Sequence, residues 1–554
     1  MGRLIWVLVD GLPFWLVEKT VGSAAPLPVM RRLQRLGRMS RLVPAQPNCQ
    51  TPPSLASLFT GRPPSDTGLT GFDIPDFAAG PLAIVPAFER GVTAGLGFVW
   101  DKVRAAGGRM RLCHVPFVAA ERLGDALLAG SYGFVKPALP PLVERLPDAG
   151  ALRWSVRDGP ILELERTKRG ARVRMLDERA GVIDSAVVTL GASMHLLLGE
   201  GLRTIVTIVT IDEAFHAVTL GAWRPIHHGD AQQIARDLDD LQIPYFAKSL
   251  SGLYRAGRLG RSLHDDGDGA AEHLLVSAVA RLAERYDREA LAAVNRRDAE
   301  FVLAYQPAVD LALHELIGFL DPACAHYRPP RAAIAQREIM RVLTRLDAFI
   351  GRLADATEPD DRVLVCSDHG MMAIDTIVQP NAALAARGWL AIDADGRIRP
   401  DESICFLHPA ETGLLMINCD MMASKDMSEE SLFAALLADL KAASGRSAEI
   451  FTWDDGGKRH GKWNVRHYLA PGLRCQAKAS VNGPVARASR KTGDHCVARG
   501  SPQLDGIVID VNGNLPRPPG PIETHDVAAL LLGRPLRARS RARCRTGPLS
   551  VASG

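Results

Sequence analysis

With 554 residues, the chain is too long to fold around one simple core, and we expect two or more structural units. Its composition, with 47% hydrophobic and 23% charged residues, is that of a soluble globular protein and excludes a chain of low-complexity segments. The net charge of +4, left by 66 basic and 62 acidic residues, gives no reason to expect a nucleic acid polymer as a partner.

The N-terminal segment is the first predicted element. Its apolar run has the outline of a secretory signal, but Asp10 interrupts it and Pro26 follows the position where cleavage would occur. We therefore interpret Leu4 to Val9 as a strand. No uninterrupted apolar run reaches the roughly 18 residues that span a bilayer, so we expect no membrane partner. Nine scattered cysteines without a Cys-x-x-Cys pair predict reduced thiols and a cytoplasmic protein.

Apolar strand-like runs then alternate with helical patterns, which predicts a parallel sheet with helices on its faces. From about residue 150 to 260 the pattern changes to strands joined by glycine-containing turns, which is typical of an antiparallel insertion. The βα pattern returns before residue 300, and residues 400–485 form a second mixed segment. A basic, Gly- and Ser-containing end predicts a disordered tail.

Two predicted strands end in potential metal ligands. In an open parallel sheet, ligands bind at the carboxyl ends of the strands. Asp10 ends the first strand, although Asp-Gly after a strand is often a plain turn. Asp368 and His369 directly follow the buried-looking run Val363 to Cys366 and the serine after it. Two adjacent ligands at the end of a strand indicate a metal site more strongly.

Thr51 opens a predicted helix. We expect Thr51 at the N-cap, Pro52 at the first helical position and Gly61 as the C-cap. A well-capped helix without further function has the same pattern. The backbone N–H groups and dipole at such an end, however, also attract anions such as phosphate. A threonine hydroxyl is a weak nucleophile at neutral pH and requires a base or a metal.

Asp310 and His314 are four residues apart on a predicted helix, so both project from one face. Carboxylate and imidazole together suit Zn²⁺, and Mn²⁺ or Fe²⁺ less well. The same spacing occurs at Asp212 and His216. That pair lies in the strand-rich segment and lacks the Tyr-x-Pro that precedes the first pair, so we favour Asp310 and His314.

Together, these segments resemble the type I phosphodiesterase/nucleotide pyrophosphatase family of the alkaline phosphatase superfamily. The resemblance extends from residue 4 to residue 535, and its motifs stand in the family's order. They are Asp10-Gly11; Thr51 with Ser57, Thr60 and Gly61; Tyr305, Pro307, Asp310 and His314; Ser367 to Gly370; Gly493-Asp494-His495; Gly506 to Ile509; and Leu531-Leu532-Gly533.

The resemblance implies an α/β fold: an alkaline-phosphatase-like core of a mostly parallel sheet flanked by helices, with inserted mixed α/β cap segments. It implies two divalent metal ions, Zn²⁺ or alternatively Mn²⁺, and Thr51 as the nucleophile that forms a phosphothreonine intermediate. The implied ligands of one metal are Asp10, Asp368, His369 and the Thr51 hydroxyl, and those of the other are Asp310, His314 and His495.

The implied substrate is small and contains phosphate: a phosphodiester or a nucleotide-type pyrophosphate. The alternatives are a phosphonate such as phosphonoacetate, or a phosphomonoester, at the same site. The chain departs from the family at Thr67, where His is usual, and at Ser54, where Asn often contacts phosphate. A non-catalytic scaffold is a further alternative, but all seven metal-site residues are present, which argues against it. The oligomeric state is not readable from the sequence.

The expected organisation interleaves the catalytic core with two insertions. The core comprises residues 1–145, 296–400 and 486–536. A strand-rich cap segment at 146–295 and a second insertion at 401–485 interrupt it, and a disordered tail at 537–554 ends it.

Overall fold

The computed structural model describes residues 2–22, 27–46, 48–87, 95–116, 126–129, 137–199, 201–224, 226–239, 250–410, 413–450, 458–467, 469–496, 500–516 and 520–534. The predicted tail of residues 537–554 lies outside them. Within these ranges, no helix combines the length and the apolar character that a bilayer crossing requires.

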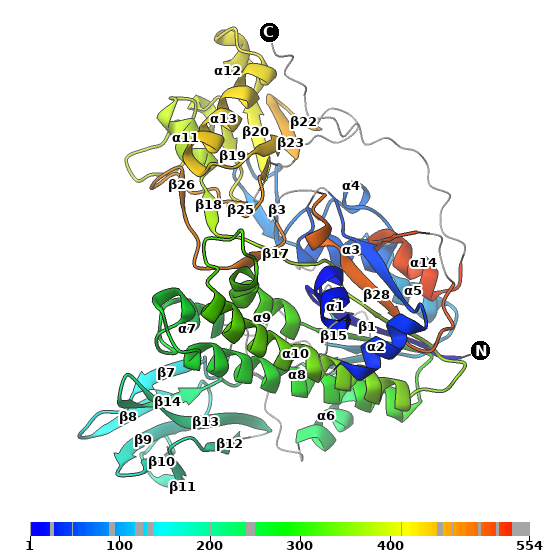
Figure 1. Ribbon diagram of the computed structural model, residues 1–554, viewed down its shortest axis with the longest axis vertical. Coiled ribbons are helices and arrows are strands. Elements are labelled where there is room, and N and C mark those ends of the chain that lie inside the picture. The colour runs from blue at the N-terminus through cyan, green and yellow to red at the C-terminus, as the bar shows by residue number, and fades with distance from the viewer. Residues whose placement is uncertain are drawn as a thin grey trace.

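An eight-stranded sheet forms the centre of the molecule (Figure 1). Its middle strands run parallel, while β28 is antiparallel to both of its neighbours. The predicted mostly parallel α/β core is thus confirmed, and the predicted first strand coincides with β1. In order across the sheet, the strands are β29 (Ile522–Glu523), β2 (Met39–Val43), β28 (Gly506–Asp510), β16 (Arg362–Cys366), β1 (Leu4–Val9), β15 (Phe301–Gln306), β5 (Met110–Cys113) and β6 (Leu127–Ala129).

Helices cover both faces of this sheet, which is why β1 is an unbroken apolar run. Ile5, Val7 and Val9 pack on one face, and Trp6 and Leu8 on the other. The first face carries α1 (Phe14–Val21), α2 (Pro28–Arg35), α8 (Ala270–Arg296), α9 (Ala308–Leu316) and α10 (Pro329–Asp355). The second carries α3 (Thr51–Thr60), α5 (Val99–Ala105) and α14 (Val527–Leu531).

The strand-rich insertion forms two four-stranded antiparallel sheets, at the lower left of Figure 1. The antiparallel pairing predicted for this segment is confirmed. One sheet contains β8 (Ala151–Ser155), β9 (Ile161–Thr167), β10 (Gly170–Leu176) and β11 (Val182–Thr189). The other contains β7 (Leu142–Arg145), β12 (Ser193–Gly199), β13 (Leu202–Ile211) and β14 (Ala214–Thr219), and α6 (Ala231–Asp239) and α7 (Leu250–Arg255) follow.

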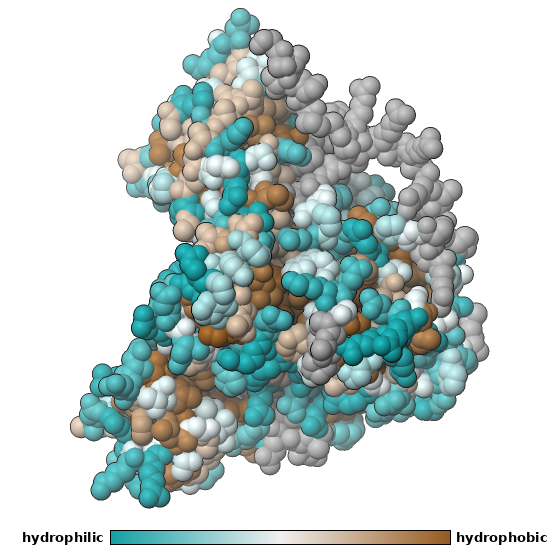
Figure 2. Space-filling view, viewed as in Figure 1, coloured by the Kyte–Doolittle hydropathy of each residue, from teal (hydrophilic) through white to brown (hydrophobic). Residues whose placement is uncertain are grey.

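Hydrophobic surface gathers on this insertion, and Figure 2 shows brown residues on the lower lobe among hydrophilic ones. Five of the eleven exposed large hydrophobic side chains in the described residues lie between positions 182 and 197. They belong to β11, β12 and the turn between them, which form the edges of the two sheets.

The second insertion is a separate lobe at the top of Figure 1, with its own hydrophobic core. Its main sheet contains β19 (Cys405–Leu407), β20 (Leu414–Asn418), β23 (Trp463–His467) and β22 (Lys458–His460). Its helices are α12 (Cys419–Ser424) and α13 (Glu429–Ser444). Helix α11 (Pro380–Ala386) precedes the predicted insertion of residues 401–485 but packs in the same hydrophobic core. Short elements complete the chain: α4 (Pro64–Thr67), β3 (Asp73–Pro75), β4 (Ile84–Pro86), β17 (Met372–Ala373), β18 (Thr376–Val378), β21 (Ala448–Ile450), β24 (Leu469–Pro471), β25 (Cys475–Ala477), β26 (Ala486–Ala488) and β27 (Gly493–Asp494).

Candidate active site

Asp10, Asp368 and His369 form a first cluster at the carboxyl ends of two neighbouring strands. Strands β1 and β16 pair in parallel, so the residues that follow them lie side by side. His369 Nε2 lies 3.4 Å from Asp10 Oδ1 and 3.3 Å from Asp368 Oδ2. All three side chains are buried. The cluster offers two carboxylates and one imidazole to a shared ion.

Asp310, His314 and His495 form a second cluster. Helix α9 follows β15, the other neighbour of β1, and its geometry brings His314 Nε2 to 3.2 Å from Asp310 Oδ1. His495 follows β27, and its Nε2 lies 3.8 Å from the same carboxylate oxygen. One carboxylate and two imidazoles thus converge on one position.

The two clusters are adjacent, and Thr51 lies beside them. The rings of His369 and His495 stack, with their centroids 3.7 Å apart and an interplanar angle of 17°. Thr51 Oγ1 lies 3.4 Å from His369 Nε2. All seven residues predicted for the site are therefore brought together in one largely buried region, although they come from five separate segments of the chain.

The imidazoles are oriented as metal ligands usually are. A carbonyl oxygen only accepts, so an Nδ1 atom beside one carries the proton, and the Nε2 lone pair then points to the carboxylates. A neutral imidazole and a carboxylate that face each other in this way need a cation or a proton between them. The Nδ1 to carbonyl oxygen distances are 2.9 Å for His369 to Gly370, 2.7 Å for His314 to Gly493 and 3.2 Å for His495 to Cys49.

In Asp10 and Asp368, likewise, one carboxylate oxygen is held by a hydrogen bond and the other faces the cluster. Asp10 Oδ1, Asp310 Oδ1 and Asp368 Oδ2 are buried and make no hydrogen bond within the described ranges. Tyr305 donates its hydroxyl proton to Asp10 Oδ2, and the backbone N–H groups of Gly11 and His369 donate to Asp368 Oδ1. Because buried charged oxygens are costly without a partner, this arrangement fits two divalent cations.

Gly11 allows the end of β1 to approach helix α9. Its φ is +65°, a conformation that other residues rarely adopt. A Cβ atom at this position would lie only 2.8 Å from Asp310 Cβ. A side chain at residue 11 would therefore separate the two clusters.

Without a metal ion, protons bound to the carboxylates neutralise part of the negative charge of the two clusters. Burial, with repulsion from Asp310, raises the pKa of Asp368 to about 7, and burial also raises the pKa of Asp10 well above 3.8. Burial alone would raise the pKa of Asp310 and lower that of His314. Their mutual attraction outweighs it and shifts each pKa the other way. Metal binding therefore displaces protons.

This proton–metal competition predicts a pH-dependent stabilisation by metal. A carboxyl group with a raised pKa stabilises the metal-free fold below its unfolded pKa, near 3.8, and that contribution is lost as the pH rises through about 7. The metal-bound carboxylates are already ionised and lose nothing. The Tm gap between Zn²⁺-loaded and chelator-treated protein should therefore widen from about pH 5 to about pH 8 in calorimetric scans. A constant or narrowing gap would contradict this.

Helix α3 differs from the prediction at its start. Gln50, with extended backbone angles, is the N-cap, and Thr51 is the first helical residue. The Thr51 hydroxyl caps no backbone N–H and instead faces His369. The predicted C-cap at Gly61 is confirmed, with φ +69°.

The helix end also offers fewer donors to an anion than the sequence suggested. Pro52 and Pro53 have no N–H, and the Ser54 N–H donates to Gln50 O at 3.1 Å. In this first turn only the Thr51 N–H has no acceptor among the described residues and is left for an anion. The Ser54 hydroxyl, which the sequence did not single out as a donor, is fully buried and makes no hydrogen bond within the described ranges.

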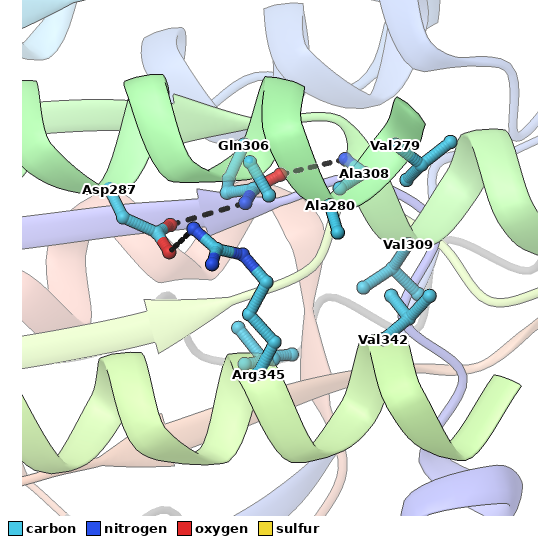
Figure 3. Close-up of a pocket in the computed structure, with 10 residues that line it drawn as sticks. Val279, Ala280, Asp287, Gln306, Ala308, Val309, Val342 and Arg345 are labelled. Carbon is cyan, nitrogen blue, oxygen red and sulfur yellow. Dashed lines mark hydrogen bonds and ion pairs between the residues drawn. The ribbon is translucent and has the colours of Figure 1, made fainter. Parts of the chain in front are cut away.

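A buried polar chain holds the start of α9 (Figure 3). Gln306 Oε1 accepts the Ala308 N–H at 2.7 Å, and Gln306 Nε2 donates to Asp287 Oδ1 at 3.2 Å. Arg345 donates to the other oxygen of Asp287 at 2.8 Å. The cavity beside them measures only about 10 Å³, which is too small for a substrate.

The rival pair, Asp212 and His216, lies in the strand-rich insertion, apart from both clusters. Asp212 lies in the turn between β13 and β14, and His216 lies on β14, where its Nδ1 is 3.1 Å from Ala214 O. Neither belongs to any group of three potential ligands among the described residues. The pair therefore has no third ligand there.

Comparisons with known proteins were made by sequence and by structure. No curated protein matches the chain. Phosphonoacetate hydrolase from Sinorhizobium meliloti 1021, solved with phosphonoacetate, has 12% identity and a TM-score of 0.47, over 96% of this chain and 95% of that one. Murine ectonucleotide pyrophosphatase/phosphodiesterase 5, solved with AMP, has 11% identity and a TM-score of 0.41, over 97% and 96%. The human protein has 12% identity and a TM-score of 0.42, over 96% and 94%.

The sequence model of the type I phosphodiesterase / nucleotide pyrophosphatase family matches residues 4–117 and 239–473, more than half of the chain. The unmatched stretch between these ranges contains both antiparallel sheets of the strand-rich insertion. The matched ranges contain six of the seven predicted site residues, and His495 lies beyond them. The chain therefore belongs to the type I phosphodiesterase/nucleotide pyrophosphatase family and is a phosphoric ester hydrolase.

Proposed function

We propose that this enzyme hydrolyses a phosphodiester or a nucleotide-type pyrophosphate bond through a phosphothreonine on Thr51. Thr51 Oγ1 releases its proton to solvent and attacks phosphorus. A bond from Oγ1 to phosphorus forms as the bond from phosphorus to the leaving oxygen breaks, and the leaving group departs with that electron pair and takes up a proton from solvent. Water then cleaves the phosphothreonine and restores the hydroxyl. The observation that carries the proposal is the position of Thr51 Oγ1, 3.4 Å from His369 Nε2 at the junction of the two clusters.

Each cluster would hold one divalent metal ion. Asp10, Asp368 and His369, with the Thr51 hydroxyl, would hold one, and Asp310, His314 and His495 the other. When bound, the ions supply positive charge that stabilises the threonine alkoxide and the phosphoryl oxygens. Three carboxylates and three imidazoles suit Zn²⁺ best and Mn²⁺ second.

The remaining contribution of the chain is orientation. Tyr305 turns one oxygen of Asp10 away from the site, and the Gly11 and His369 N–H groups do the same for Asp368. The other oxygens then face the ions without reorganisation during the reaction. Placing Thr51 at the start of α3 also puts its hydroxyl at the positive end of the helix dipole.

Ser54 is proposed to donate its hydroxyl proton to the transferred phosphoryl group. It stands one turn after Thr51, so its side chain leans toward the nucleophile. Ser54→Ala should lower kcat by about 10- to 100-fold, because a donor to the charged transition state is lost. The Tm should not fall, since the Ser54 hydroxyl makes no hydrogen bond to any described part of the chain.

Ser57→Ala is the matched control for Ser54. Ser57 is equally buried on the same helix, but its hydroxyl donates to Pro53 O at 2.9 Å. The control should lower the Tm and leave kcat unchanged. Unchanged kcat in Ser54→Ala, or an equal loss of Tm in both variants, would show that Ser54 has only a structural role.

A substrate panel tests the reaction class. Initial rates should be compared for bis-p-nitrophenyl phosphate, p-nitrophenyl phosphate, dinucleotides and phosphonoacetate, each with Zn²⁺ or Mn²⁺. We expect the diester and the dinucleotides to give the highest kcat/KM. Preference for the monoester or for the phosphonate would assign the same site to one of those substrates. Turnover of none of the four would contradict the proposal.

A further inference from the structure

The start of α9 packs near α8 and α10, and the side chain of one glutamine connects the three helices. Gln306 is the last residue of β15 and is buried among α8, α9 and α10 (Figure 3). Its amide nitrogen donates to Asp287 on α8, whose other oxygen accepts from Arg345 on α10. Its amide oxygen accepts the N–H of Ala308, the first residue of α9.

The direction of these bonds is fixed by chemistry. An ionised carboxylate can only accept, so Asp287 selects the nitrogen side of the Gln306 amide. The oxygen side is then turned to α9, where an N–H at a helix start has no partner within its own helix. The ion pair with Arg345 holds Asp287 in place, since Asp287 is only 2% exposed and a buried charge requires a partner.

Helix α9 carries both Asp310 and His314, so its first turn decides where the second cluster lies. Asp310 is two residues after Ala308, and its carboxylate is the atom group that both His314 and His495 approach. A small rotation of the first turn would move this carboxylate more than it moves the first cluster. Asp368 and His369 follow another strand, and Asp10 meets the turn through its backbone, where its carbonyl accepts the Asp310 N–H at 3.1 Å.

We propose that Gln306, oriented by Asp287, is a positioning residue that sets the affinity of the second metal site. Its backbone carbonyl accepts the Asp10 N–H at 2.9 Å, but its side chain bonds to Asp287 and to Ala308 and so acts through the first turn of α9. This inference rests on the proposed two-metal site and names a determinant of one of its halves. Groups that orient metal ligands from outside typically change affinity by about 10- to 100-fold.

The test exchanges the negative charge between residues 287 and 306 in the full-length protein. In Gln306→Glu the side chain still accepts the Ala308 N–H, but it places a second carboxylate against Asp287. In the double variant Gln306→Glu with Asp287→Asn, the asparagine can donate to the glutamate, and Arg345 still has an anionic neighbour. The donor and acceptor have exchanged places, and the total charge is that of the native protein.

The readout is Zn²⁺ affinity measured by competition with a chromophoric chelator, which does not depend on turnover. Gln306→Glu should lower the Zn²⁺ affinity of the second cluster by about 10- to 100-fold and that of the first cluster by less than about threefold. The double variant should restore the second affinity to within about threefold of native. Equal weakening of both ions, or failure of the exchange to restore binding, would overturn the proposal.

Gln379→Glu controls for a merely structural effect. Gln379 is also a buried glutamine at the start of a helix, α11, but that helix packs in the core of the upper lobe, and the Gln379 Nε2 donates to Pro484 O. It should lower the Tm and leave both Zn²⁺ affinities unchanged. A native chain that binds one ion only would overturn the two-metal site itself. If the native chain binds both Zn²⁺ ions but hydrolyses none of the tested substrates, the result would contradict the proposed reaction and leave the role of Gln306 unaffected.

Discussion

Thr51→Ala should reduce turnover of a chromogenic phosphodiester by at least about 10⁴-fold. The variant lacks the oxygen that we propose attacks phosphorus, and within the described ranges no other hydroxyl lies within hydrogen-bonding distance of His369 Nε2. The fold should persist, because the Thr51 hydroxyl caps no backbone group of α3. Steady-state rates, circular dichroism and metal content measured on one preparation check this expectation.

Thr51→Ser is the informative partner of that variant. It keeps the hydroxyl and removes only a methyl group, so a substantial fraction of the native rate should return. Acid quenching during turnover of a labelled diester should trap phosphate on the native chain and on Thr51→Ser but not on Thr51→Ala. Activity retained in Thr51→Ala would move the nucleophile to another residue, and activity absent from Thr51→Ser would point to a packing role for the methyl group.

The parts of this site that the sequence predicts are those that follow a periodic pattern. The unbroken apolar run before Asp10 predicts a strand covered on both faces, and the residue that ends it falls at the carboxyl edge of the sheet. The four-residue spacing of Asp310 and His314 places both on one helical face. These inferences need no knowledge of the rest of the chain.

The parts that escaped prediction depend on remote backbone atoms. The Nδ1 atoms of His314 and His495 each face a carbonyl oxygen of another segment, and a carbonyl has no signature in the sequence. His495 itself was placed only by resemblance, because it follows a short strand in an irregular loop. Gln306 gave no signal either, since its role depends on Asp287 and Arg345 from two other helices.

The N-cap error has a tertiary cause. Thr-Pro before an apolar run matches the pattern of an N-cap followed by the first helical residue. Here the hydroxyl faces His369, more than 300 residues away, and the helix begins one residue earlier than predicted. Similarly, the run Gly506 to Asp510 predicts a strand but not its direction, and only the structure shows it antiparallel to its neighbours.

The two clusters should bind two divalent ions per chain. A substitution in one cluster should remove its ion and leave the other ion bound. Elemental analysis of the native protein should give close to two Zn²⁺ or Mn²⁺ ions, and chelation should abolish turnover until metal is returned. Asp368→Ala should leave one ion, because it removes a ligand of the first cluster only. His314→Ala should also leave one ion, because His314 approaches Asp310 and no ligand of the first cluster.

The double variant separates two independent sites from one shared site. If the clusters are distinct, Asp368→Ala with His314→Ala should bind neither ion tightly, while each single variant still binds one. His216→Ala, which removes the imidazole of the rival Asp-x-x-x-His spacing, should retain both ions and full activity. Loss of both ions in either single variant would mean that the stacked imidazoles of His369 and His495 couple the clusters into one binding unit. A native content of one ion or none would remove the basis for charge stabilisation at Thr51, because its hydroxyl would then have no second cation beside it.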